Sequence, residues 1–184
     1  MPIFGRWKAE RQLHERAERF VARLLQEPDA EHVTWLAGAA TRGDADHAAW
    51  ELRYARRALG LVSAQRDALD DRTGAAVAHA MAGAFERDRR IGRDRLELAQ
   101  RQFNDRLSAY RDAVGARVTA ATPARLGRTL LAFAGGSFRD LDANVERAGE
   151  LLAADLRSAN EALREIFGAA SLPEHVPPSA IGGR

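Results

Sequence analysis

The sequence contains no cysteine, and Lys8 is the only lysine among 28 basic residues. The missing cysteines exclude a disulfide scaffold, a thiolate metal site and a cysteine nucleophile. Arginine in such excess over lysine is typical of a GC-rich coding genome rather than of a phosphate-binding surface. No stretch approaches the ~18 uncharged residues of a membrane span, and no apolar run resembles a signal peptide. We therefore expect a cytoplasmic protein that does not contact a membrane.

Charge of neither sign dominates the chain. The 26 acidic residues nearly balance the basic ones, and the net charge is +2. A nucleic-acid-binding domain usually concentrates basic residues on one face, whereas here acids and arginines interleave. The composition therefore argues against nucleic acid as a partner.

At 184 residues and 46% hydrophobic content, the chain is long and apolar enough to bury one core, which favours a single domain.

Runs that alternate apolar and polar residues, which are typical of strands, are also missing. Apolar residues recur instead every three or four positions, the period of an α-helix. Pro28 ends the first such segment, and Asp29 and Asp44 can act as N-caps of the next two. Thr122 as N-cap and Pro123 at the first helical position predict a further helix start. Helices are predicted over residues 6–26, 30–36, 44–70, 71–90, 93–117, 122–134 and 137–163.

These segments predict an all-α, single-domain helical bundle of about five to seven helices with short connections over residues 1–170. Residues 171–184 contain three prolines, and we expect them to form an extended or disordered C-terminal tail. The tryptophans Trp7, Trp35 and Trp50 are expected to fill the core or to seal helix junctions.

The densest polar cluster in the sequence lies between residues 44 and 57. His47, Glu51 and Tyr54 share one helix face there, so they are candidates for a ligand pocket. Imidazole and carboxylate are also ligands for a divalent metal, which makes His47 and Glu51 weak metal candidates. The Glu-x-x-His motifs of di-iron bundles are absent, however, and we expect neither a metal nor a cofactor. In the alternative interpretation, His47 edges the core and is hydrogen-bonded to Glu51 or to an arginine.

Arg66 occupies an unusual position, because it interrupts the apolar series between Val62 and Leu69. On a continuous helix it would face the core, and an unpaired buried guanidinium costs roughly 3–5 kcal/mol. Asp67 and Asp70 are possible partners, so Arg66 and Asp70 are candidates for an anion-binding or ion-pair pocket. The alternative, which we favour, is that the helix ends here and Arg66 extends into solvent.

Arg72 and His79 are separated by six residues and fit the Arg-x(4–6)-His pattern of HEPN ribonucleases, which are all-α bundles. Arg42 and His47 form a second copy of this pattern. The chain resembles that family in the pattern and the fold class. The resemblance implies an enzyme that cleaves RNA, in which Arg72 and His79 act on a phosphodiester. Seven residues are almost two helical turns, so this pair would share a face.

The same helix face carries small residues. A helix that is apolar on one side and rich in alanine and glycine on the other is often used in self-association. We therefore predict a non-catalytic interaction or scaffold protein that forms a homo-oligomer or binds a protein partner. The alternatives are a HEPN-like ribonuclease and a ligand- or metal-binding bundle around His47, Glu51 and Arg66. The interface candidates are Ala75, His79, Ala82, Gly83 and Glu86.

Overall fold

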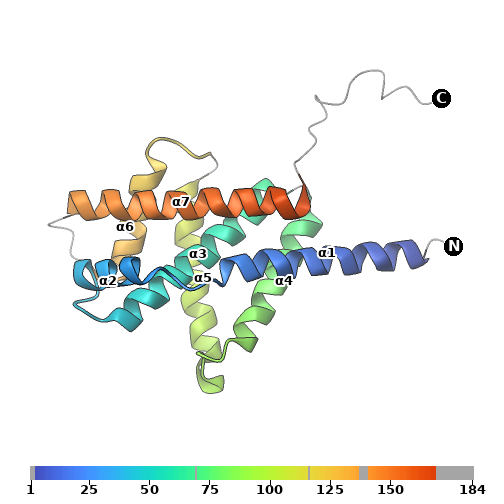
Figure 1. The fold of residues 1–184 in the computed structure, drawn as a ribbon, viewed down its shortest axis with the longest axis horizontal. Helices are drawn as coiled ribbons and strands as arrows, with labels where there is room; N and C mark the ends of the chain where they lie inside the picture. Colours follow the sequence, from blue (N-terminus) through green and yellow to red (C-terminus); the bar gives the residue numbers. More distant parts are fainter. Residues whose placement is uncertain (1–2, 69, 116, 137–140, 169–184) are drawn as a thin grey trace.

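The computed structural model describes residues 3–68, 70–115, 117–136 and 141–168. Within these ranges the chain forms seven α-helices, one short 3-10 helix and no strand, so the predicted all-α bundle is confirmed (Figure 1). The tail over 171–184 and the predicted helix start at Ser137 lie outside the described residues. The elements are α1 (Ile3–Leu24), α2 (Ala30–Ala39), α3 (Ala45–Asp67), α4 (Asp71–Arg87), η1 (Arg93–Arg95), α5 (Leu96–Val114), α6 (Thr122–Phe133) and α7 (Leu141–Phe167).

Three helix starts follow from capping carboxylates. Asp29 accepts a hydrogen bond from the backbone N–H of Glu31, and Asp44 accepts one from that of His47, as their sequence positions predict. Asp70 caps α4 in the same way, with the N–H of Thr73 at 2.7 Å. Because this hydrogen bond stabilises the ionised form, it lowers the pKa of Asp70.

Several predicted boundaries were wrong by a few residues. The helix predicted over 71–90 ends at Arg87, where Asp88 leaves the helical conformation. The helix predicted over 93–117 begins as a 3-10 turn and ends at Val114, since Gly115 has a φ of +68° that favours glycine. The sixth helix begins at Thr122 rather than after it, with Ala121 in the cap position.

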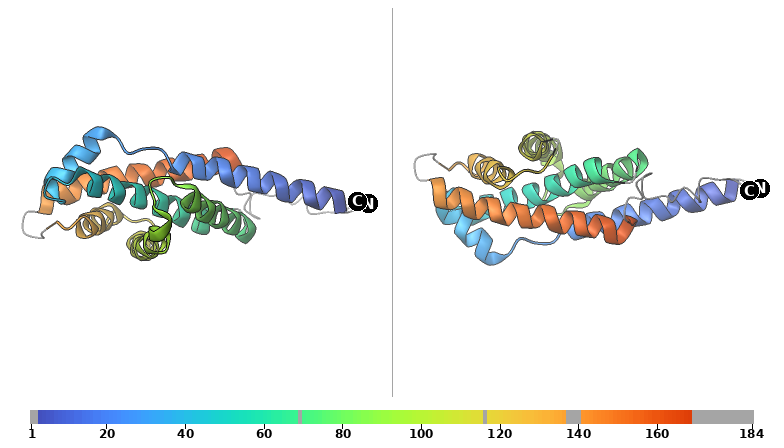
Figure 2. Two further views of the ribbon diagram at one scale, coloured as in Figure 1. Left: turned by 90° about the horizontal axis from the view of Figure 1, so that it is seen from below. Right: turned by 90° about the horizontal axis from the view of Figure 1, so that it is seen from above.

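The central element of the fold is α3. It contacts each of the other six α-helices of the described chain. Helices α1 and α2 lie on one side of it and α5 and α6 on the other (Figure 2). Its residues are buried around most of the helix, including Ala48, Leu59 and Ala64 with no exposed surface. This arrangement buries Glu51 and Arg57 of the polar cluster of residues 44–57, whereas Asp44 and Asp46 at the start of α3 remain exposed.

Helices α6 and α7 pack closely through two glycines. A Cβ added to Gly127 would overlap the carbonyl oxygen of Val145, and one added to Gly149 would lie 2.5 Å from the carbonyl oxygen of Pro123. The apolar residues that recur every three or four positions along α7 from Val145 to Leu163 are buried, including Ala148 and Leu152 with no exposed surface. Among the described helices, none is both long enough and apolar enough to cross a bilayer.

Candidate functional site

The N-terminal part of α1 extends beyond the rest of the described helices (Figures 1 and 2). We call residues 7–16 the α1 arm. All of its side chains are exposed except Leu13, which is half-buried, whereas Ala17 and Phe20 just beyond it have no exposed surface. Trp7 is 61% exposed, with the guanidinium of Arg11 over its ring at 5.9 Å. The expectation that Trp7 fills the core was therefore wrong, because α1 is longer than the surface it packs against.

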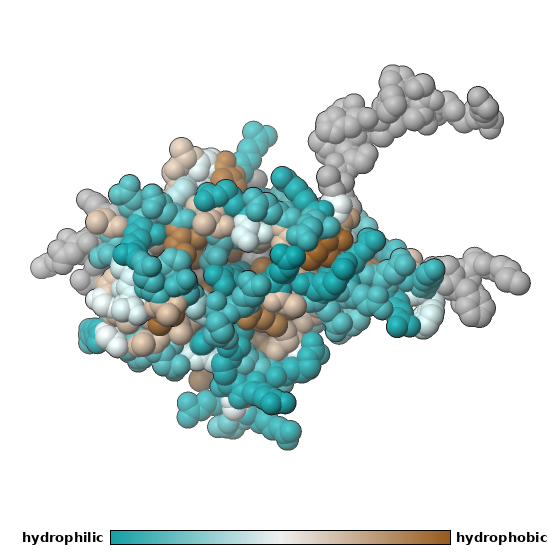
Figure 3. Space-filling model, viewed as in Figure 1, coloured by the Kyte–Doolittle hydropathy of each residue, from teal (hydrophilic) through white to brown (hydrophobic). Residues whose placement is uncertain are grey.

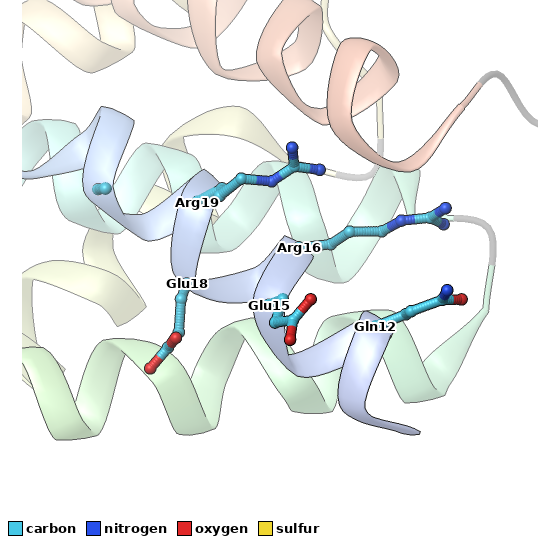
Figure 4. Close-up of a pocket in the computed structure, with 6 residues that line it drawn as sticks. Gln12, Glu15, Arg16, Glu18 and Arg19 are labelled. Carbon is cyan, nitrogen blue, oxygen red and sulfur yellow. The ribbon is translucent and has the colours of Figure 1, made fainter. Parts of the chain in front are cut away.

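A hollow of about 610 Å³ runs along α1, and the described residues that line it all belong to this helix. Gln12, Arg16 and Arg19 extend to one side of the helix, whereas Glu18 points toward α4 (Figure 4). A surface lined by one helix lacks an opposing wall to hold a small molecule. We therefore treat the hollow as part of an open helix surface.

The small residues predicted as an interface lie on the surface of α4. Ala75, His79, Ala82 and Glu86 are exposed, and Gly83 is half-buried. The opposite side of α4 is buried in the core through Val77, Met81 and Phe85 and two further residues, Ala80 and Ala84. Packing within the chain thus leaves this α4 stripe, which consists of Ala75, His79, Ala82, Gly83 and Glu86, largely exposed. We call the α1 arm together with this stripe the α1–α4 face.

Arg72 and His79 share the exposed side of α4, as the seven-residue spacing predicts. The side chain of Arg72 is 65% exposed, and its Nη2 lies 3.8 Å from a carboxylate oxygen of Glu10 in α1. The ring of His79 lies 6.3 Å from that of His14, whose Nε2 is 3.4 Å from Glu18. The two residues of the ribonuclease pattern therefore lie within the α1–α4 face.

His47, Glu51 and Tyr54 come together as predicted and line a cavity of about 410 Å³. The cavity lies between α3, α5 and residues 90–95, which connect α4 to α5. Nε2 of His47 lies 3.3 Å from Glu51, and the Tyr54 hydroxyl donates to Oε1 of Gln102 at 3.4 Å. Burial raises the pKa of this hydroxyl, which keeps it a donor.

Glu51 is the most deeply buried acid of the cavity, and its partner is Arg106 of α5. Their hydrogen bonds are bidentate, at 2.8 Å from Nε and 2.5 Å from Nη2, and the two side chains are 3% and 12% exposed. The Arg106 guanidinium also lies 4.4 Å above the ring of Phe133. Burial lowers the pKa of Arg106, but the hydrogen bonds and charge of Glu51 outweigh this effect and raise it. No local sequence signal points to this pair, since the residues are 55 positions apart.

The other pocket candidates do not join this cavity. Arg66 lies near the end of α3, about 28 Å along the helix axis from His47. It pairs with Asp67 at 2.6 Å, not with Asp70, which caps α4. The side chain is half-buried, and its Nη1 is buried with no hydrogen-bond partner among the residues that the structure describes. The helix ends at Asp67, as the favoured interpretation expects, but Arg66 does not extend into solvent, since its side chain is only 24% exposed.

A second ion-pair network, which the sequence patterns did not indicate, joins α3 to the end of α4. Arg57 is 1% exposed and donates to Asp88 at 3.0 Å. Asp88 also accepts two hydrogen bonds from the guanidinium of Arg90 and one from its backbone N–H. Arg90 in turn pairs with Glu27, which also binds Arg53. Burial lowers the pKa of Arg57, but an arginine remains charged in proteins, so the hydrogen bond to Asp88 is charge-assisted.

The arrangement gives little support to a metal site. No three His, Asp or Glu side chains of the described residues gather in a way that could hold a metal ion. A metal site at His47 and Glu51 would need a second carboxylate ligand, but the group beside Glu51 is the cation of Arg106.

We also compared the chain with protein-family models, with curated proteins and with solved structures, and it matches none of them.

Proposed function

We propose that this protein is a non-catalytic interaction or scaffold protein that self-associates through the α1–α4 face. The observation that carries the proposal is the exposure of the α1 arm on nearly all its sides, with Trp7 61% exposed at its outer end. Most of the stability of a helix in a protein comes from packing of one face against its neighbours, and residues 7–16 have little such packing. A partner that covers the arm would therefore stabilise it.

The charges of the arm favour a second copy of the chain as this partner. Basic Lys8, Arg11 and Arg16 interleave with acidic Glu10 and Glu15 along the helix. A surface that carries both signs in similar number can pair with itself about a two-fold axis, because each group then meets a complementary group on the other copy. A strongly acidic or basic partner would gain less from such a surface.

The α4 part of the face adds the shape that close helix packing needs. Ala75, Ala82 and Gly83 leave a shallow surface, and the distance between packed helices decreases with the size of the side chains at the contact. A Cβ added to Gly83 would meet only the flexible end of Arg87, with Nη1 at 3.0 Å, so this part of the helix has room on its outer side.

The test is the oligomeric state of the full chain and of Ala82→Arg, measured by analytical ultracentrifugation. We expect the wild-type chain to dimerise and Ala82→Arg to weaken the dimer at least about tenfold, because a charged side chain would have to be buried. Ala132→Arg, on the exposed side of α6, is the matched control and should dimerise normally. A wild-type chain that stays monomeric at several hundred micromolar, or equal effects of both variants, would refute the proposal.

Ribonuclease activity is the second candidate, favoured by the placement of Arg72 and His79 on the same exposed face. A dimer formed through this face would bring two such pairs together. Cleavage of a single-stranded RNA that is lost in both Arg72→Ala and His79→Ala, with dimerisation intact, would replace the non-catalytic assignment by this one. Equal RNA decay with all three proteins would exclude it.

A further inference from the structure

We propose that the cavity between α3, α5 and the α4–α5 connection binds a small organic phosphate. Its volume of about 410 Å³ lies within the ~300–1,000 Å³ typical of small-molecule sites. Its residues are separate from those of the α1–α4 face, so this proposal and the proposed function can fail independently. Three walls contribute: His47, Trp50 and their neighbours from α3, residues 90–95 of the connection, and Leu98, Gln102 and Arg106 from α5.

The polar groups of the cavity have more free donors than free acceptors. Both oxygens of Glu51 are bound by Arg106, and Oε1 of Gln102 accepts the hydrogen bond of the Tyr54 hydroxyl. Among the described residues, the amide N–H groups of Gln102 have no acceptor, and the guanidinium of Arg95 has only an exposed contact to Asp94 at 3.9 Å. This surplus of donors favours a ligand rich in acceptor oxygens over one rich in donors.

Asp46 is the second carboxylate of the lining. It is exposed in the first turn of α3, where the helix dipole favours its negative charge. Unlike Glu51, it lies at the mouth of the cavity in contact with water. It therefore limits how an anion can approach but leaves the donors on the connection and on α5 accessible.

The charge of the α4–α5 connection favours an anion. Residues 87–95 contain five arginines and two aspartates, and Asp88 is already shared by Arg57 and Arg90. A second hollow of about 460 Å³, which Arg90 also lines, is formed by Arg87 and Arg89 together with the carboxylates of Glu27 and Asp88. Hydrophilic side chains cover the tip that this connection forms (Figure 3). Such a cluster attracts anions from solution, and the planar guanidinium matches phosphate oxygens.

The remaining lining fits the organic part of the ligand. Trp50, Ile91 and Ala99 supply apolar surface, and Leu98 is 45% exposed at the edge of the cavity. Leu98 is one of only three large apolar side chains that are exposed among the described residues, and packing within the chain does not account for it. A ring or alkyl group seated here would cover Leu98 while its phosphate meets Arg95 and Gln102.

Isothermal titration calorimetry with phenyl phosphate tests the proposal on the full chain. Inorganic phosphate lacks the apolar part, phenol lacks the anion and benzoate carries a carboxylate instead. We expect phenyl phosphate to bind at least about tenfold more tightly than each of the three, because only it uses both the guanidinium and the apolar wall. Binding of none of these compounds, or tightest binding of phenol or benzoate, would overturn the proposal.

Two variants and a control locate the site. Arg95→Gln and Leu98→Ala should each weaken phenyl phosphate binding about tenfold, and Leu98→Ala should leave the weak binding of inorganic phosphate unchanged. Arg93→Gln is the matched control, since Arg93 is exposed in the same 3-10 helix but does not line the cavity. All three side chains are exposed, so the variants should fold, which circular dichroism checks. Equal losses in Arg93→Gln and Arg95→Gln would show unspecific attraction to the arginine tip and overturn the site.

Discussion

Gly127 of α6 lies directly against Gly149 of α7, where a Cβ on Gly127 would be 2.9 Å from the backbone nitrogen of Gly149. Backbone cannot move aside as a flexible side chain can. We therefore expect Gly127→Ala to push the two helices apart and to lower the free energy of unfolding by about 1–3 kcal/mol in urea titrations.

Gly38→Ala is the control for this substitution. A Cβ on Gly38 of α2 would meet nothing within 4 Å. Alanine there should raise the free energy of unfolding by roughly 0.5–1 kcal/mol, because it restricts the unfolded chain and favours the helix. A Gly127→Ala protein as stable as Gly38→Ala would contradict the close packing of α6 on α7.

The buried pair of Glu51 and Arg106 predicts that the stability of the fold depends strongly on having both partners or neither. Arg106→Met would remove the guanidinium from the carboxylate of Glu51, which is 3% exposed, and leave the imidazole of His47 at 3.3 Å beside it. We expect a loss of about 3–5 kcal/mol in the free energy of unfolding, most of it recovered in the double variant Glu51→Met/Arg106→Met. Arg11→Met, which removes the exposed pair with Glu15, should change stability by no more than about 0.5 kcal/mol. Additive losses in the double variant would contradict this coupling.

Asp88 predicts a specific loss of stability in acid. Burial raises its pKa, but hydrogen bonds from Arg90 and Arg57 outweigh this and lower the value from 3.8 to about 2. Because the folded pKa lies below the unfolded one, the carboxylate stabilises the fold above the unfolded pKa, and this contribution is lost as the pH falls from 3.8 to about 2. The shift corresponds to roughly 2 kcal/mol.

Urea titrations at several pH values across this window measure the effect. Asp88→Asn should be less stable than the wild type at neutral pH, and the difference should shrink as the pH falls below the unfolded pKa. A difference that stays constant across the window would mean that Asp88 does not titrate with a depressed pKa.

The exposure of Trp7 separates its role in association from any role in folding. Trp7→Ala should change the stability of the monomer by no more than about 0.5 kcal/mol, since little of the side chain is buried. It should weaken self-association about tenfold or more, because aromatic anchors dominate interface energies. Val118→Ala, at a 54% exposed apolar residue outside the α1–α4 face, is the control and should associate like the wild type. Unchanged association of Trp7→Ala would remove the arm from the interface.

The helices and most of their starts follow from the amino-acid sequence alone. Asp29, Asp44 and Asp70 cap helices through backbone N–H groups two or three residues away, so the signal is contained in a few neighbouring positions. The three-to-four spacing of apolar residues likewise defined the buried side of α7, because a regular helix converts spacing directly into a face. The same geometry placed His47, Glu51 and Tyr54 together on one side of α3.

What those faces meet depends on the packing of the helices against one another. Glu51 and Arg106 are 55 positions apart, and with 28 basic residues in the chain its sequence offers many equivalent partners for one carboxylate. Trp7 has the same apolar character as the buried residues of α1, but the helices packed on α1 end before they reach it. Local patterns fix the conformation of a segment, whereas ion-pair choice and exposure depend on how far each packed neighbour extends, which is a property of the assembled bundle.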